Sequence, residues 1–151
     1  MKLAEALHLR ADLQKRIEQL SFRLRNNARV QEGDEPAEDP KILLAELDTN
    51  TAELARLITA INMTNSRTLA DGVTLTAMIA EKDALSLKIS VLRSFIEVAS
   101  ARVDRHSASE IRICSSVNVR EEQKKVDSLS KQLRELDVKI QGLNWTTDLI
   151  E

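Results

Sequence analysis

The segment LAEALHLRADLQKRIEQLSFRLRNN, residues 3–27, decides the fold of this chain. Its apolar residues recur at alternating steps of three and four, a spacing that places them along one side of a helix and is typical of coiled coils. The positions in this series are Leu3, Ala6, Arg10, Leu13, Ile17, Leu20, Leu24 and Asn27, of which Arg10 and Asn27 are the polar members. We expect a helix over residues 2–31 whose apolar side packs against another helix.

Three further segments show the same alternation and predict three more helices. The first spans residues 40–65, where Asp39 and Pro40 form a good N-cap and first-turn pair. The others span residues 74–106 and 119–142, and Gly142 weakens the last turn. Their apolar sides consist of Leu43, Leu47, Thr51, Leu54, Ile58, Ile61 and Asn65; of Leu75, Met78, Lys82, Leu85, Ile89, Leu92, Ile96, Ala99 and Val103; and of Val119, Glu122, Val126, Leu129, Leu133, Leu136, Ile140 and Leu143.

The connections between these helices span residues 32–39, 66–73 and 107–118, and residues 143–151 form a C-terminal tail. Residues 32–39 are rich in acidic side chains, and Asp71 followed by Gly72 is a turn signal. Residues 107–118 contain the β-like stretch of the sequence, but one strand cannot satisfy its own backbone groups. This segment either crosses the end of a helical bundle as an extended connection or pairs with a strand from another copy.

Composition supports an all-α fold. Among 151 residues there are two phenylalanines, one tryptophan, no tyrosine, three glycines and two prolines, too little turn punctuation for a many-stranded sandwich or barrel. Short connections between long helices favour antiparallel neighbours. We therefore predict a single domain over residues 1–151, an antiparallel four-helix, coiled-coil-like bundle with an extended β-like connection between its third and fourth helices.

Charge is balanced overall and unbalanced locally. The net charge of −2 offers no broad attraction to nucleic acid, which makes a nucleic-acid partner unlikely. Residues 1–31 carry seven basic and three acidic side chains, whereas residues 32–65 carry two basic and eight acidic ones. We expect the first two helices to lie side by side, each supplying counterions to the other.

The sequence also indicates where the protein resides. No run of about 18 apolar residues occurs, and Glu5, His8 and Arg10 interrupt the start where a secretory signal needs an apolar stretch. We expect a cytoplasmic protein without a membrane partner. The single Cys114 cannot form an internal disulfide and has no CxxC companion.

Several phrases of the sequence are distinctive when taken together. They are MKLAEALHLRADLQKRIEQL, VQEGDEPAEDP, INMTNSRT, TLTAMIAEKDALSLKI, SEIRI and NWTTDLIE, which lie between residue 1 and residue 151. The chain resembles a family of small bacterial helical proteins of uncharacterised function, some of whose members carry the label septicolysin. The resemblance implies no catalytic residues, and the label implies a cytolysin. Cys114, however, lacks the aromatic neighbours of a thiol-activated pore former, and the stretch VTLTAMIA is too short for a membrane hairpin.

Two cations occupy positions on the apolar sides of the predicted helices. Arg10 follows Leu3 by seven residues, and Lys82 follows Leu75 by seven, so both fall at similar height when the first and third helices start from the same end. Because burying an unpaired charge is costly, we expect a carboxylate such as Asp137 to pair with them. Arg10, Lys82 and Asp137 form either an anion- or ligand-binding site or a structural polar layer that sets helix register.

A second candidate site surrounds the one tryptophan of the sequence. The hydrogen-bonding side chains that the bundle topology places near it include those of Asn62, Asn65, Arg67 and Asn144, next to Trp145 itself. They form either an interaction patch, since Trp and Arg often anchor interfaces, or a set of helix caps beneath a Trp145 lid.

No catalytic motif is present, and we expect neither a metal nor a cofactor. We therefore predict a non-enzymatic interaction or scaffolding protein that self-associates, with a further protein partner of unknown identity as an option. Apolar residues beside the predicted helix contacts motivate this interpretation: Leu7, Leu9, Phe22, Leu44, Leu57 and Leu87. The alternative is a protein that binds a small anion, another ligand or a metal through the polar layer, and a cytolysin is the least favoured function.

Overall fold

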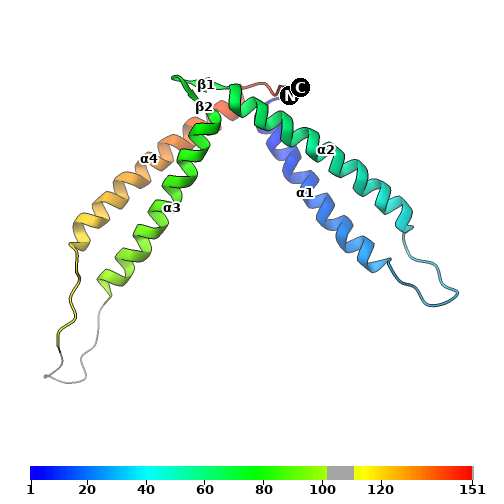
Figure 1. Cartoon of the computed structure of the whole chain (residues 1–151), viewed down its shortest axis with the longest axis horizontal. Coiled ribbons are helices and arrows are strands. Elements are labelled where there is room, and N and C mark those ends of the chain that lie inside the picture. Colours follow the sequence, from blue (N-terminus) through cyan, green and yellow to red (C-terminus); the bar gives the residue numbers. More distant parts are fainter. Residues whose placement is uncertain (102–110, 151) are drawn as a thin grey trace. The chain divides into compact units, whose positions relative to one another are not determined.

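The computed structural model describes residues 1–101 and 111–150 of the chain. Four helices dominate it, α1 (Leu3–Asn26), α2 (Pro40–Arg67), α3 (Leu75–Ser100) and α4 (Val119–Thr146), as Figure 1 shows. The strands β1 (Leu69–Ala70) and β2 (Val73–Thr74) form a two-stranded antiparallel sheet. The predicted all-α class with four helices is confirmed.

The chain groups into two compact units. Unit 1 contains Met1–Leu75 together with the residues from Gly142 onward, and unit 2 contains Thr76–Gln141. The boundary within α4 falls at Gly142, the glycine expected to weaken this helix. A single domain over residues 1–151 stays a prediction.

In unit 1, the antiparallel helices α1 and α2 lie side by side (Figure 1). The buried residues of α1 match the predicted spacing and include Leu3, Ala6, Leu13 and Leu20. Arg23 bridges the helices, because its Nη2 lies 2.6 Å from Glu38 Oε1 and its Nη1 lies 3.4 Å from Glu46 Oε2. Arg23 of α1 therefore pairs with one acidic side chain of the connection and one of α2, which agrees in part with the predicted exchange of counterions between these helices.

The contact face of α2 differs from the prediction at three positions. Thr51, Ile58 and Asn65 were expected on it, but the buried residues are the preceding ones in the chain, Asn50, Leu57 and Thr64. Spacing explains the shift, since Asn50, Leu57 and Thr64 continue a strict seven-residue repeat from Leu43. The hydroxyl of Thr51 instead donates to Leu47 O of its own helix, at 2.9 Å.

The ends of α1 and α4 differ from the predicted ones. Helix α1 ends at Asn26 and not at residue 31, because the side chain of Asn27 forms hydrogen bonds that end the helix. Its Nδ2 donates to Arg23 O at 2.9 Å, and its Oδ1 accepts a hydrogen bond from Glu38 N at 3.0 Å. Helix α4 continues past Gly142 to Thr146, whose hydroxyl donates to Gly142 O at 2.9 Å. Helix α3 ends at Ser100, and the predicted helical residues 102–106 lie outside the described residues.

The connection over residues 66–73 is more ordered than predicted. Asp71 and Gly72 both have positive φ, 53° and 78°, as a tight hairpin turn with a right-handed twist requires. The strands beside the turn pair Leu69 with Thr74 and Ala70 with Val73. The turn prediction is thus correct, and it lies within a hairpin that joins α2 to α3.

In unit 2, α3 and α4 pack around a small aliphatic core. Ile89 and Ile96 of α3 are buried together with Val126 of α4. Partly buried residues that pack against this cluster are Leu85, Leu92, Val119, Leu129 and Leu133. The connection before α4 contains no strand over its described residues 111–118, and residues 107–110 lie outside the described part of the chain. Pairing with a strand of another copy stays a prediction.

Candidate functional site

One ion pair expected for the polar layer lies in unit 2. Lys82 Nζ on α3 lies 3.5 Å from Asp137 Oδ1 on α4, so the expected carboxylate does pair with this lysine. Both side chains are only partly exposed, which keeps the charges close to the helix contact without full desolvation. Arg10 is half-buried on α1 in unit 1, and its role in a joint layer with Lys82 stays a prediction.

The predicted patch around Trp145 lies within unit 1. Its residues differ in exposure, because Asn144 is buried, Asn65 is half-buried, and Asn62 and Arg67 are exposed. Trp145 itself is 57% exposed, too open for a lid over a core.

One close contact of the Trp145 ring is with another side chain of unit 1. The centroids of the Trp145 and His8 rings are 6.4 Å apart, and the ring planes are tilted by 46°. This geometry lies within the range of a weak aromatic contact, which fixes one edge of the indole and leaves the rest to solvent.

Beside this patch, the two ends of the described chain are tied together. Leu3 N donates to Thr147 O at 3.0 Å, and Leu149 N donates to Met1 O at 2.9 Å. We call residues 1–3 and 146–150 the terminal clasp. It was not predicted, because backbone hydrogen bonds leave little signature in a sequence, although the opposite charges of residues 2 and 148 could have suggested it.

Side chains reinforce the terminal clasp. Lys2 Nζ lies 2.8 Å from Asp148 Oδ1 and also donates to Thr146 O at 3.2 Å. The hydrogen bond from Lys2 lowers the pKa of the Asp148 carboxyl, and the positive charge of Lys2 acts in the same direction. The buried hydroxyl of Thr64 accepts a hydrogen bond from Ile150 N at 2.9 Å, which attaches the tail to α2.

A mainly apolar cleft of about 440 Å³ lies between α1, α2 and the terminal clasp, and we call it the terminal cleft. Its volume is within the range of small-molecule sites. Apolar side chains dominate its walls, with Glu53 and Arg56 as its charged residues. The lining consists of Met1, Leu9, Glu53, Ala55, Arg56, Leu57, Thr59, Ala60, Met63, Leu149 and Ile150.

A more polar groove of about 400 Å³ lies between α3 and α4. Arg93 Nη2 donates to Ser130 Oγ at 3.3 Å within it. The lining also includes Arg134, which suits an anion, and the carboxylate of Glu97, which opposes one. The groove therefore has mixed polarity and no clear preference for one charge.

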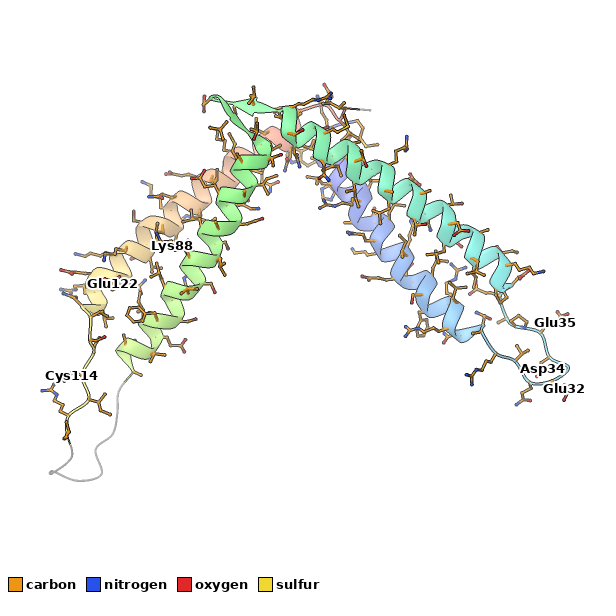
Figure 2. The ribbon with its side chains drawn as sticks, viewed as in Figure 1. Glu32, Asp34, Glu35, Lys88, Cys114 and Glu122 are labelled. Atoms are coloured by element: carbon orange, nitrogen blue, oxygen red, sulfur yellow. The ribbon has the colours of Figure 1, made fainter. Side chains whose placement is uncertain are left out.

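The acidic connection between α1 and α2 carries Glu32, Asp34 and Glu35, which Figure 2 labels along the loop. Among residues 1–101 and 111–150, no group of three or more His, Cys, Asp or Glu side chains is arranged to hold a metal ion. Two acidic residues of this connection make structural contacts: Asp39 caps α2 by accepting a hydrogen bond from Lys41 N, and Glu38 pairs with Arg23. The hydrogen bond from Arg23 lowers the pKa of Glu38. The same hydrogen bond raises the pKa of Arg23.

An exposed apolar surface of unit 2 lies on α3, away from the contact with α4. Leu87, Val91, Phe95 and Val98 are between 41% and 78% exposed. On a helix Leu87, Val91 and Val98 lie about half a turn away from the buried Ile89 and Ile96. Phe95 lies at the edge of this side, about a third of a turn from the same two residues. The exposed Ala80 and Ala84 extend this side toward the start of α3. We call these six residues the α3 stripe.

Comparison with known proteins places the chain in a family. A family model matches residues 10–149, which is nearly the whole chain, and describes a family of unknown function, DUF6847. The chain belongs to this family. No protein of curated function matches it.

One solved structure is similar to this chain along its whole length. The crystal structure of a functionally unknown conserved protein from Corynebacterium diphtheriae is 42% identical in sequence. The match covers 99% of each chain, with a TM-score of 0.92. The family membership agrees with the uncharacterised helical family that the sequence resembles.

One further property bears on what this family member can do. Within residues 1–101 and 111–150, no helix combines the length and the apolar character that crossing a bilayer requires. Candidate binding surfaces among the described residues include the exposed ring of Trp145, the terminal cleft and the α3 stripe.

Proposed function

We propose that this protein is a non-enzymatic interaction or scaffolding protein that self-associates, and that it acts in the cytoplasm without a cofactor. The observation that carries the proposal is the α3 stripe. Large apolar side chains on a helix of a soluble protein normally face a core, and several in one line mark a contact surface. A pair of helices leaves much of its surface exposed, and the stripe of unit 2 lies outside the contact between α3 and α4, where a partner can reach it.

The position of the aromatic residues supports the same function. Phe22, Phe95 and Trp145, the aromatic residues of the sequence, are all at least 41% exposed. Aromatic side chains contribute much of the binding energy at interfaces, and exposing all of them is unfavourable for an isolated molecule in water. Phe95 belongs to the α3 stripe, which makes this stripe the first candidate for self-association.

Sedimentation velocity from micromolar to millimolar concentration tests the proposal. We expect the wild-type protein to sediment as a dimer or a larger oligomer, and Leu87→Glu to shift it toward the monomer, because a charge within an apolar interface has to be desolvated. Val138→Glu is the matched control, since Val138 on α4 is 71% exposed and lies outside the stripe. A wild-type monomer at every concentration would contradict self-association.

A second candidate function is the binding of a small ligand. The polar layer that motivated it contains one paired cation, Lys82, and the observation that now favours ligand binding is the terminal cleft. Its apolar walls suit an acyl chain, and Arg56 suits a carboxylate head. We expect laurate to raise the thermal midpoint of the wild type and to leave that of Ala60→Trp, which fills the cleft, unchanged. Equal responses of both proteins would exclude this site.

The cytolysin implied by the septicolysin label is the least favoured function. A pore former has to place apolar helices or a closed β-barrel across the bilayer. Release of a trapped dye from phosphatidylcholine vesicles is the direct test, and we expect none above the level of a buffer control.

A further inference from the structure

We propose that residues 147–150, which we call the strap, close on an acyl ligand in the terminal cleft, so that ligand binding and docking of the strap stabilise each other. This proposal rests on the second candidate function, the binding of a small ligand, and specifies how that site responds to its ligand. Three features of unit 1 support it: the position of the strap, its attachment, and the distribution of charge along the cleft.

The strap forms part of the wall of the terminal cleft. Leu149 and Ile150 line the cleft together with Leu9 of α1 and with Leu57 and Met63 of α2. Leu149 and Ile150 are only half-buried, so part of their apolar surface is still in contact with water. A ligand in the cleft removes more of this surface from water, and each methylene that becomes buried adds to its affinity. Part of the binding energy therefore depends on a docked strap.

The strap is attached mainly by polar contacts. Two backbone hydrogen bonds join it to residues 1–3, and Ile150 N donates to the buried hydroxyl of Thr64. The ion pair of Lys2 with Asp148 adds little, because its side chains are 40% and 76% exposed. None of residues 147–150 belongs to the buried core. A segment attached in this way opens at a lower free energy than the helices beside it, so the contacts of one ligand suffice to shift its population.

Charge lies at the end of the cleft away from the strap. Met63 adjoins Thr64, which binds the strap, and Arg56 precedes Met63 by two turns of α2, about 10 Å at a rise of about 1.5 Å per residue. From Glu53 to Met63 the lining follows α2 for about 15 Å at the same rise, comparable to an extended twelve-carbon chain. The cleft thus fits a ligand whose chain end lies beneath Leu149 and Ile150 and whose head lies at Arg56.

The head of this ligand is best a carboxylate. Arg56 is exposed, and among the residues that the structure describes no acidic side chain forms an ion pair with it. Glu53, about one turn before Arg56, also lines the cleft and opposes an anion. We therefore expect Arg56→Gln to weaken the binding of laurate about two- to fivefold, the range for an exposed charge pair, and Glu53→Gln to strengthen it.

Amide hydrogen exchange measured by NMR with and without laurate tests the coupling. At ten times its Kd, a ligand that binds only the docked state lowers the released population of the strap about tenfold. The helix walls still contact part of the chain when the strap is released, so we expect the amides of Leu149 and Ile150 to exchange about three- to tenfold more slowly with laurate. The amide of Val126, in the core of unit 2, should keep its rate.

Ile150→Ala separates the side chain of the strap from its backbone attachment. This variant keeps the amide that donates to Thr64 and loses most of the apolar wall, so laurate should bind at least threefold more weakly and slow the exchange of the strap less. Ile42→Ala is the matched control, since Ile42 on α2 is 66% exposed and does not line the cleft, and its affinity for laurate should equal that of the wild type.

The outcomes separate the strap from the ligand site. Unchanged or faster exchange of Leu149 and Ile150, in a protein whose thermal midpoint laurate raises, overturns the coupling and leaves the ligand site intact. Equal slowing in the wild type and in Ala60→Trp, which fills the cleft, also overturns it, because laurate then acts elsewhere. An unchanged affinity of Arg56→Gln overturns the placement of the head. A wild type that shows no response to laurate overturns both the ligand site and the coupling.

Discussion

Replacing Thr64 with valine should release the C-terminal tail from unit 1. Thr64 is fully buried on α2, and its hydroxyl serves two bonds. It donates to Ala60 O at 2.8 Å and accepts from Ile150 N at 2.9 Å. Valine has nearly the same shape and lacks the hydroxyl, so the substitution removes these bonds and leaves the packing of the side chain intact.

The size of the effect follows from the two bonds. The hydrogen bond that the Thr64 hydroxyl donates goes to Ala60 O in the same helix and contributes little to stability. The accepted bond is worth about 0.5–1.5 kcal/mol, with a further penalty when the amide of Ile150 stays without a partner. Because Ile150 is half-buried, water reaches part of this amide. We expect a loss of about 1–2 kcal/mol in the docking of the tail, which is roughly a 5- to 30-fold increase in its open population.

Amide hydrogen exchange measured by NMR reports this opening residue by residue. In Thr64→Val, the amides of Leu149 and Ile150 should exchange faster by the factor given above, while the amides of unit 2 keep their rates. Thr49→Val is the matched control, because the exposed Thr49 makes the same kind of bond within α2, to Ala45 O at 2.9 Å, and does not contact the tail.

Equal exchange rates in the two variants would refute the reasoning. They would show that the backbone bonds of the terminal clasp hold the tail without help from Thr64. A loss of protection throughout α1 and α2 would also contradict it, because the substitution would then disturb the helix pair and not the tail alone.

Three further predictions concern the ion pairs and the core. Lys82→Met should leave the urea midpoint of unfolding unchanged or raise it slightly, because a partly exposed ion pair contributes about 0–1 kcal/mol and methionine packs well at a helix contact; a loss above this range would make the pair with Asp137 essential. Since the folded-state pKa of Asp148 is depressed, the stabilisation that its pair with Lys2 gives the terminal clasp is present above the unfolded pKa and is lost as pH falls through the folded value. Carbon-13 titration should therefore place the Asp148 carboxyl below 3.8, the ordinary value for this group, and a titration at or above that value would argue against the pair. Ile89→Ala should destabilise unit 2 by about 2–5 kcal/mol in denaturant titrations, because Ile89 is almost fully buried in its core, whereas a loss below 1 kcal/mol would mean that the core collapses around the change.

The helices were predictable from the sequence because their contact faces are almost purely aliphatic. The spacing of Leu3, Leu13 and Leu20 can be met only by a helix that buries one side. The shift on α2 shows where this reasoning weakens. Asn50 and Thr51 are both polar, so the apolar pattern did not show which of them faces α1. The seven-residue repeat that starts at Leu43 indicates Asn50, which is the buried one.

The grouping of helices was harder to predict than the helices themselves. A heptad pattern identifies the buried face of a helix but does not name the helix that covers it. On α3 two faces are apolar: one around Ile89 contacts α4, and the other contains Leu87 and Val91. Leu87 was expected beside the contact, but the continuous stripe was not predicted, although a count of apolar residues around the full turn of the helix would have indicated it.

The candidate sites were predicted in part. The ion pair of Lys82 with Asp137 followed from the cost of an uncompensated charge at a helix contact. The terminal cleft could not be inferred, because its walls come from Met1, Met63 and Ile150, which are distant in sequence and have no common motif.

The terminal clasp has a consequence for the order in which the protein assembles during synthesis. Helices α1 and α2 are complete at Arg67, but Thr147, whose carbonyl accepts a hydrogen bond from Leu3, is added about 80 residues later. At roughly 5–20 residues per second, a ribosome needs about 4–16 s for this stretch. Throughout that interval the Thr64 hydroxyl of the nascent helix pair lacks its Ile150 partner, and the terminal cleft lacks the lining residues Leu149 and Ile150. A molecule that enters the cleft at this stage meets a wider opening than in the finished protein, and the arrival of the last residues closes it in.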